Sequence, residues 1–275
     1  MLTDYHVHLR PDAPGTTAER HFTVANAQAY REAATERGIA ELGVSEHIYR
    51  FHQALDVWQH DLWRDSAVDD IDAYCAFVRE DTDLRLGIEA DFVPGREDRM
   101  GELLAARDWD YVVGAVHFLG DHALDHPDYD IWALGQSPDK VWAQYFEWLG
   151  EAARSGLFDI LAHPDLVKMW GADRPRPEGD LRRFYELAMD GISESGVAVE
   201  LSTAGLRKPV GEVYPATGFL EMVIAAGNPI SLSSDAHIAD DLGHGYDQAR
   251  ELLEGLGVRE LAVFERRERR LEPIG

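Results

Sequence analysis

The stretch "DYHVHLRPD", residues 4–12, places two histidines one residue apart, directly after an apolar start. Side chains alternate between the two faces of a β-strand, so His6 and His8 are expected on the same side of the chain. Taken alone, the pair is equally compatible with two solvated imidazoles at the edge of a strand. The positions of the other polar residues along the chain decide between that interpretation and a functional site.

Short apolar, β-rich runs alternate with longer helical patterns along the whole chain. The predicted strands are 2–7, 40–45, 84–89, 111–117, 158–163, 197–202 and 229–234, with 260–265 as a candidate eighth. The predicted helices are 23–38, with Thr23 as N-cap, then 66–80, 97–107, 138–155, 178–195, 216–226 and 245–256. Continuous apolar strands that alternate with helices indicate a parallel sheet covered on its faces. No linker-like stretch interrupts the pattern, so we expect one α/β domain over residues 1–275.

Polar residues that can bind a metal end each of the seven predicted strands. They are His6 and His8, Glu46 and His47, Glu89 followed by Asp91, His117, His163, Glu200, and Asp235 with His237. In a parallel α/β barrel these strand ends meet at one face, where active sites lie. Any one of them alone would more often be a cap or a hydrogen-bonded structural residue. Their recurrence at successive strand ends favours a metal site, and their number exceeds the roughly three ligands of one catalytic ion.

The composition restricts the class of partner and the compartment. The formal net charge is −25, from 26 basic and 51 acidic residues, which disfavours long nucleic acids as partners. Cys75 is the single cysteine, so no internal disulfide can form, and we expect it to be a buried small side chain on a helix. The chain shows no apolar leader or membrane-spanning run, which predicts a soluble, cytoplasmic protein.

The order of these residues resembles the PHP (polymerase and histidinol phosphatase) superfamily. The shared pattern is HxH, then "SEH", a strand-terminal Glu, two single histidines and DxH, and it covers nearly the whole chain. "AHPDLVKMWG" (162–171) and "ELSTAGLRKPVGEVYP" (200–215) resemble the histidinol-phosphatase branch. The resemblance implies a distorted TIM-like barrel of seven β/α units with two or three divalent transition-metal ions, zinc, manganese or iron.

The resemblance also implies a ligand for each metal. One ion would be held by His6, His8, Glu89 and Asp235, and Glu89 would bridge to a second ion on His117 and His163. His47 and His237 would belong to the third ion. Family members commonly add a histidine about eight residues after the first of HxH, but here that position is Pro14. Asp12 is the nearest substitute and His21 a second candidate, so the third site is bound through one of them, weak or absent.

Phosphate monoester hydrolysis suits such a site, because close metals generate a hydroxide nucleophile and neutralise phosphoryl oxygens. The expected reaction is hydrolysis of L-histidinol phosphate to L-histidinol and phosphate, in histidine biosynthesis, by a metal-bridging hydroxide. Glu89, Asp235 and His237 are the candidate catalytic residues, with Asp235 or His237 protonating the leaving alkoxide through water. The candidate phosphate-binding residues are Arg207, Lys208, Ser202 and Arg10. For the ammonium group of the substrate, the candidate acids are Glu46, Asp91, Asp165 and Glu212.

Three other functions stay open on the sequence. A PHP phosphoesterase acting on nucleotides or short oligonucleotides is the main alternative, since the acidic balance disfavours only long polymers. A metal-dependent amidohydrolase also uses HxH and a late Asp, but its usual strand-end lysine has no counterpart here, because Lys168 lies five residues past His163. A non-catalytic metal-stabilised binding module is the third. The sequence predicts neither the metal nor the oligomeric state.

Overall fold

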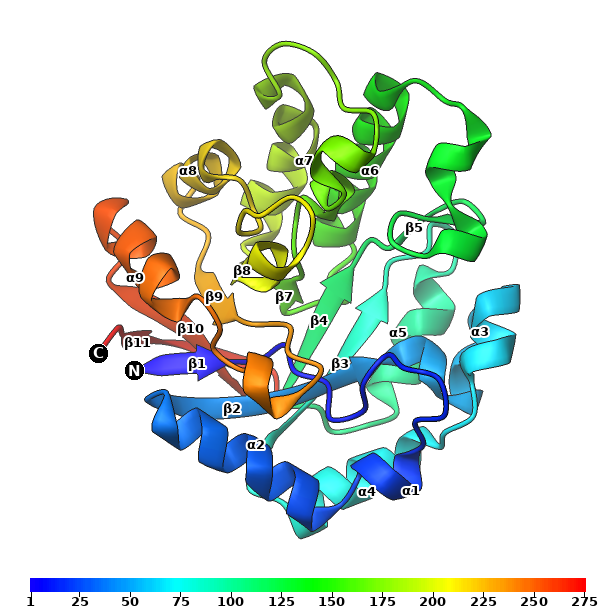
Figure 1. Ribbon diagram of the computed structural model, residues 1–275, viewed down its shortest axis with the longest axis vertical. Helices are drawn as coiled ribbons and strands as arrows, with labels where there is room; N and C mark the ends of the chain where they lie inside the picture. Colours follow the sequence, from blue (N-terminus) through cyan, green and yellow to red (C-terminus); the bar gives the residue numbers. More distant parts are fainter.

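The computed structural model describes residues 1–275 and contains one parallel sheet of seven strands, in the order β1-β2-β3-β4-β7-β8-β9 (Figure 1). These strands are β1 (Leu2–Asp4), β2 (Ile39–His47), β3 (Arg85–Asp91), β4 (Tyr111–Ala115), β7 (Ile160–Leu161), β8 (Ala198–Ser202) and β9 (Ile230–Ser233). All hydrogen-bonded pairs within the sheet are parallel. The predicted parallel α/β architecture is therefore confirmed.

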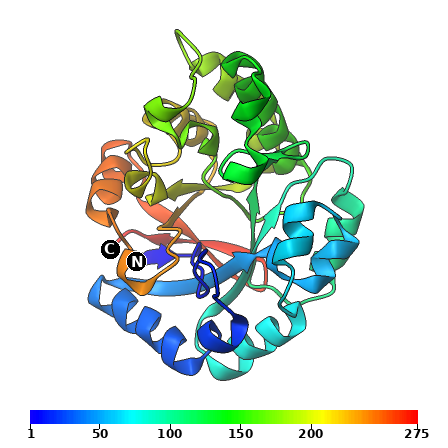
Figure 2. The same cartoon turned by 45° about the vertical axis from the view of Figure 1, so that its right-hand side comes forward.

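Helices surround the curved sheet, as the turned view in Figure 2 shows. They are α1 (Ala18–His21), α2 (Val24–Glu36), α3 (Asp61–Ser66), α4 (Ile71–Asp81), α5 (Glu97–Ala105), α6 (Pro138–Arg154), α7 (Arg182–Ser195), α8 (Thr217–Ala225) and α9 (Tyr246–Gly255). Short 3₁₀ turns lie at η1 (Ile48–Arg50), η2 (His52–Asp56), η3 (Pro127–Tyr129), η4 (Ile131–Leu134), η5 (Leu166–Lys168), η6 (Gly171–Asp173), η7 (Ala204–Arg207) and η8 (Ala239–Asp241). None of the helices combines the length and apolar composition needed to cross a membrane.

Capping side chains decide where two helices begin. Thr23 accepts a hydrogen bond from the Asn26 backbone N at 3.2 Å, which confirms it as the N-cap of α2. The predicted helix over 66–80 begins only at Ile71, because Asp70 caps α4 through the Ala73 backbone N at 2.8 Å. Cys75 lies on this helix but is half-buried, so the expectation of full burial was wrong.

No backbone ladder joins β1 to β9, and the chain pairs there only through an isolated bridge between Val7 and Ala236, which follow the two strands. The Asp4 carboxylate accepts hydrogen bonds from Ser234, from its backbone N at 3.0 Å and its Oγ at 2.6 Å. Thr3 Oγ1 donates to the Leu232 carbonyl at 3.3 Å. Buried polar side chains thus replace a backbone ladder at the seam, the place where β1 meets β9. The missing ladder makes the barrel a distorted one.

We predict that Asp4→Ala lowers the free energy of unfolding by about 2–3 kcal/mol, because it leaves the buried Ser234 N–H without a partner. Urea unfolding of the variant beside the wild type measures the loss. Asp108→Ala, at an exposed position, is the matched control and should change stability little. Equal stability of the two variants would show that the Asp4 bonds do not hold the seam.

A carboxy-terminal hairpin fills the barrel end opposite the strand tips. It consists of β10 (Glu260–Glu265) and β11 (Glu268–Pro273), paired antiparallel, so the candidate eighth strand exists but lies outside the parallel sheet. Phe264 packs on Tyr5 and Tyr111, whose ring centroids are 4.8 Å apart. Gly87 leaves room for this packing, since a Cβ there would lie 2.3 Å from the Tyr111 ring. An apolar plug therefore closes this end and leaves the carboxyl ends of the strands for chemistry.

Candidate metal centre

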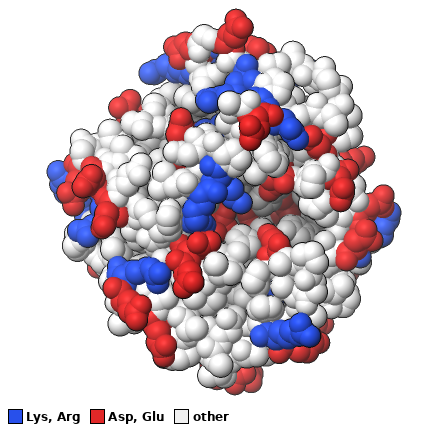
Figure 3. Space-filling model, viewed as in Figure 1, with Lys and Arg blue, Asp and Glu red and all other residues white.

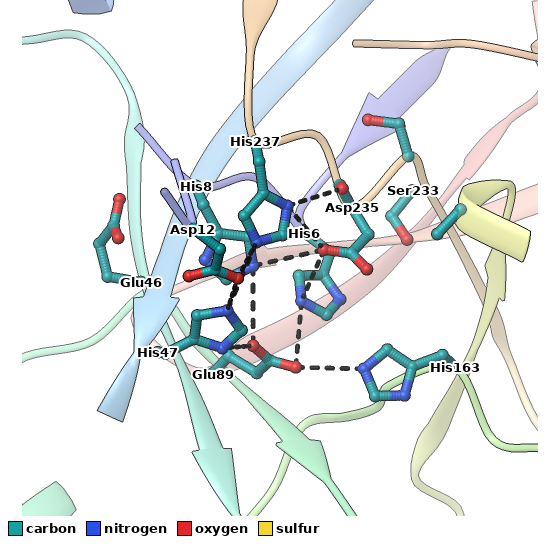
Figure 4. Close-up of polar contacts among 12 residues, drawn as sticks. His6, His8, Asp12, Glu46, His47, Glu89, His163, Ser233, Asp235 and His237 are labelled. Carbon is teal, nitrogen blue, oxygen red and sulfur yellow. Dashed lines mark hydrogen bonds and ion pairs between the residues drawn. The ribbon is translucent and has the colours of Figure 1, made fainter. Parts of the chain in front are cut away.

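The residues predicted at the strand ends converge on one point (Figure 4). His6 and His8 follow β1, His47 ends β2 and Glu89 lies in β3. His117 and His163 follow β4 and β7, and Asp235 and His237 follow β9. The parallel sheet brings these ends to one face, as the sequence predicts.

Glu89 is the hub of the cluster. Its Oε1 lies 3.2 Å from both His6 Nε2 and His163 Nε2 and 3.4 Å from His117 Nε2. Its Oε2 lies 2.5 Å from His47 Nδ1. Each carboxylate oxygen thus faces a different set of imidazoles, which is the geometry of a bridging ligand.

Asp235 and Asp12 complete the exposed side of the cluster. Asp235 Oδ1 lies 3.4 Å from His8 Nε2 and 3.6 Å from His237 Nδ1. Asp12 Oδ2 lies 3.0 Å from His237 Nε2 and 3.3 Å from His47 Nε2. Of the two candidates for the third metal, Asp12 has the contacts. His21 takes part in none of the hydrogen bonds or ion pairs of the cluster.

Three groups of donor atoms lie close enough to share an ion, each within 4.8 Å of one another. The groups are His6, Glu89 and His163; His6, His8 and Asp235; and His8, His47 and His237. Within them, His6 Nε2, His8 Nε2, Glu89 Oε2 and Asp235 Oδ1 are buried and have no hydrogen-bond partner. Orphaned buried polar atoms are rare, and imidazole with carboxylate suits divalent transition metals. The donor set therefore fits a multinuclear metal centre.

The carboxylates give the cluster a strongly negative field. Burial lowers the pKa of His47 and of His117, but the nearby carboxylates, Glu89 foremost, raise these pKa values to about 9 and about 10. Burial raises the pKa of Glu89, yet the imidazoles of His6 and His47 hold it well below its usual range. A field that favours cations this strongly also favours a metal ion.

Two acids orient the imidazoles from behind. Glu200 accepts a hydrogen bond from His6 Nδ1 at 2.9 Å and from the His163 backbone N at 2.6 Å. Asp91 Oδ1 lies 2.7 Å from His117 Nδ1. Such partners set the tautomer and direction of a ligating imidazole. The sequence places both acids at strand ends but assigns no orienting role, because the pairing depends on the register of neighbouring strands.

We predict that Asp91→Asn weakens metal binding about 10- to 100-fold, because it removes the anionic partner of His117. Competition with a chelator of known affinity measures this change directly. Asp81→Asn, at an exposed position on α4, is the control and should bind metal as the wild type does. Unchanged affinity in Asp91→Asn would contradict the orienting role.

Two of the candidate ligands occupy unusual backbone conformations. His163 has φ of 23° and Asp235 has φ of 52°, both in the region that favours glycine. Residues held in such conformations cluster at functional sites and need support from their surroundings. For His163 the support is Tyr145, whose Oη donates to the His163 carbonyl at 3.2 Å and accepts from the Leu166 N at 3.1 Å.

The four predicted phosphate-binding residues lie in different surroundings. Arg207 donates to the carbonyls of Ser234 at 2.8 Å and Asp235 at 3.0 Å, and its buried Nη1 has no partner. Arg10 ion-pairs with Asp69. Lys208 is exposed, and Ser202 Oγ accepts a local hydrogen bond from the Ala204 N at 3.3 Å.

The acids predicted for the substrate's ammonium already have partners within the protein. Glu46 accepts from the Leu9 N at 2.7 Å and ion-pairs with Arg50, and Asp91 orients His117. Lys168 Nζ lies 3.0 Å from Asp165 and 3.3 Å from Glu212. The structure therefore points away from these four residues for that role, because each carboxylate is engaged.

A pocket of about 810 Å³ opens beside the cluster. Its walls include Asp12, His47 and His117 from the centre, with Tyr49 and Asp125 further out. Figure 3 shows the hollow in this face of the molecule, with acidic atoms inside it. A small molecule can therefore reach the proposed ligands from solvent.

An α/β barrel with a histidine–carboxylate cluster at the carboxyl ends of its strands is the arrangement of a metal-dependent hydrolase. The chain belongs to the PHP domain family, whose model matches residues 21–204. It is 32% identical to "Probable histidinol-phosphatase" of Deinococcus radiodurans over 99% of each chain. It is 28% identical to "Histidinol-phosphatase" of Bacillus subtilis, over 60% of this chain and 67% of that one.

A solved structure has the same fold. Histidinol phosphate phosphatase of Lactococcus lactis, complexed with zinc, L-histidinol and phosphate, superposes with a TM-score of 0.69. The match covers 98% of each chain at 18% identity. This likeness confirms the predicted barrel of the PHP type.

Proposed function

We propose that this chain is a metal-dependent phosphomonoesterase that hydrolyses L-histidinol phosphate to L-histidinol and phosphate, as one domain spanning residues 1–275. The observation that carries the proposal is the buried cluster around Glu89, in which facing atoms of His6, His8, Glu89 and Asp235 lack hydrogen-bond partners. The full-length relative named as a histidinol-phosphatase supports the choice of substrate. A cytoplasmic location is consistent with the one free cysteine, Cys75.

We assign the ligands to two or three divalent ions, zinc, manganese or iron. His6, His8, Glu89 and Asp235 would hold one, and Glu89, His117 and His163 a second. His47, His237 and Asp12 would hold a third, with Asp12 in the place of the histidine that the family commonly uses. When bound, such ions activate water and neutralise the charge of phosphoryl oxygens.

The protein's own groups would bind and protonate the substrate. Arg207 reaches the backbone of Asp235, and its unpartnered Nη1 makes it the first candidate to bind a phosphoryl oxygen. Arg10 lines the pocket beside the cluster. Asp235 and His237, 15% and 25% exposed, are the ligands on the solvent side from which a proton can pass to the leaving alkoxide. Ser202, whose Oγ accepts from the Ala204 N, would hold the backbone of the turn that carries Arg207.

The test is phosphate release by the purified, metal-analysed protein from L-histidinol phosphate, a nucleoside monophosphate and an aryl phosphate. We expect a strong preference for L-histidinol phosphate, as judged by kcat/KM. Better turnover of the nucleotide would leave the proposed metal centre in place but contradict L-histidinol phosphate as the substrate. It would favour a nucleotide phosphoesterase. Metal binding without turnover of any ester would favour a binding module.

A further inference from the structure

Asp125 is a carboxylate of the pocket with no partner inside the protein. It is exposed, and its side chain makes no hydrogen bond or ion pair. The two arginines of the same pocket already pair with carboxylates, Arg10 with Asp69 and Arg50 with Glu46 and Asp12. Asp125 is therefore a carboxylate without an ion-pair partner in a cavity that we assign to a phosphorylated substrate.

The backbone places Asp125 beside the metal centre. The hairpin of β5 (Phe118–Leu119) and β6 (His122–Ala123) turns the chain back, so that the Leu124 N donates to the His117 carbonyl at 2.9 Å. The Leu124 carbonyl accepts from Trp170 Nε1 at 2.7 Å, which fixes the chain from the other side. Asp125, the next residue, is thus held next to a proposed metal ligand.

The charge of Asp125 acts on the interior of the site. Burial raises the pKa of Tyr49, and the carboxylates of Asp12 and Asp125 are among the charges that raise it further. Asp125 also adds to the effect of Glu89 and Asp91 on His117. A cation bound between the metal centre and the pocket mouth would therefore meet this carboxylate.

We propose that Asp125 determines specificity by receiving the ammonium group of the substrate. The inference rests on the proposed function. In L-histidinol phosphate one methylene separates the amine-bearing carbon from the ester oxygen. When the phosphoryl group lies at the metal ligands, the ammonium must lie close beside them, where His117 and Asp125 are adjacent. An ammonium–carboxylate contact then distinguishes this ester from phosphates that carry no positive charge.

The test compares Asp125→Asn with Asp121→Asn, an exposed position on the same hairpin and outside the pocket. The substrates are L-histidinol phosphate, its analogue with hydrogen in place of the amine, and an aryl phosphate. We expect Asp125→Asn to lower kcat/KM for L-histidinol phosphate by at least about tenfold, mainly through KM. Turnover of the two esters that lack an ammonium should stay within about threefold of the wild type, and Asp121→Asn should behave as the wild type.

Calorimetric binding of L-histidinol, which has the amine but no phosphate, gives a readout independent of turnover. Weaker binding to Asp125→Asn than to Asp121→Asn supports the proposal. An equal loss on all esters, or unchanged L-histidinol binding, overturns it, because the carboxylate would then act on the centre itself or not at all. If the wild type binds L-histidinol through Asp125 yet fails to hydrolyse its phosphate, the proposed function fails and the ammonium site stands.

Discussion

Glu89→Gln is expected to lower kcat by about 10³-fold or more and to reduce the metal content of the purified protein. The two carboxylate oxygens of Glu89 lie within 3.6 Å of five imidazoles, those of His6, His8, His47, His117 and His163, so this side chain links the two sides of the cluster. The amide keeps the shape of the carboxylate but removes its charge and one acceptor oxygen. Loss of a metal that stabilises transition-state charge is worth several kcal/mol, and each 1.36 kcal/mol is about tenfold in rate.

Glu102→Gln, at an exposed position on α5, is the matched control and should keep activity and metal content. The steady-state rate and the metal-to-protein ratio are measured on the same samples. If Glu89→Gln retained both its metal content and its rate, the proposal that Glu89 bridges two metal ions would be wrong. Unfolding curves recorded in parallel distinguish a lost metal from a lost fold.

Lys168→Met is expected to lower the free energy of unfolding by about 3–5 kcal/mol, the usual effect of breaking a buried ion pair. Lys168 Nζ and Asp165 Oδ2 lie 3.0 Å apart, and both side chains are buried. Lys168 also donates to the Val213 carbonyl at 2.8 Å, which ties the loop after His163 to the loop after β8. Removing the cation leaves the carboxylate of Asp165 buried without a countercharge.

A second substitution isolates the pair. Burial raises the pKa of Asp165, and the charge of Lys168 only partly lowers it, so burying this carboxylate has a net cost. The double variant Asp165→Asn with Lys168→Met should therefore be more stable than Lys168→Met alone. Lys140→Met, at an exposed position, should leave the urea midpoint unchanged. A double variant less stable than the single one would show that the two side chains do not act as a pair.

The sequence predicted the convergence of the candidate ligands because one rule governs it: the carboxyl ends of parallel strands meet at one face. The positions of His6, Glu89 and His163 in the cluster could be predicted once the strands that they follow or end were recognised. The choice between Asp12 and His21 depended on how a loop folds, which periodicity does not describe. The run 260–265 has the pattern of a barrel strand, and only tertiary packing against Tyr5 shows that it forms a hairpin instead.

The roles of residues around the ligands were harder to predict than the ligands. Asp91 and Glu200 end their strands as other ligands do, yet each faces an imidazole of a neighbouring strand. Glu46 lies near the end of β2 and Asp165 follows His163, but each accepts a hydrogen bond from a backbone N far away in the sequence, that of Leu9 and that of Ala216. Asp125 follows a hairpin whose return to His117 no local pattern indicates. Such pairings depend on register and loop closure, so they require coordinates.

The most direct test of the account is the rate of L-histidinol phosphate hydrolysis as metal is added back, in equivalents, to protein stripped with a chelator. We expect no activity without metal and a rate that rises until two or three ions are bound per chain, the number that the three donor groups can hold. Beyond that number the rate should stay constant. Full activity in stripped protein, or metal-saturated protein that leaves L-histidinol phosphate intact, would contradict it.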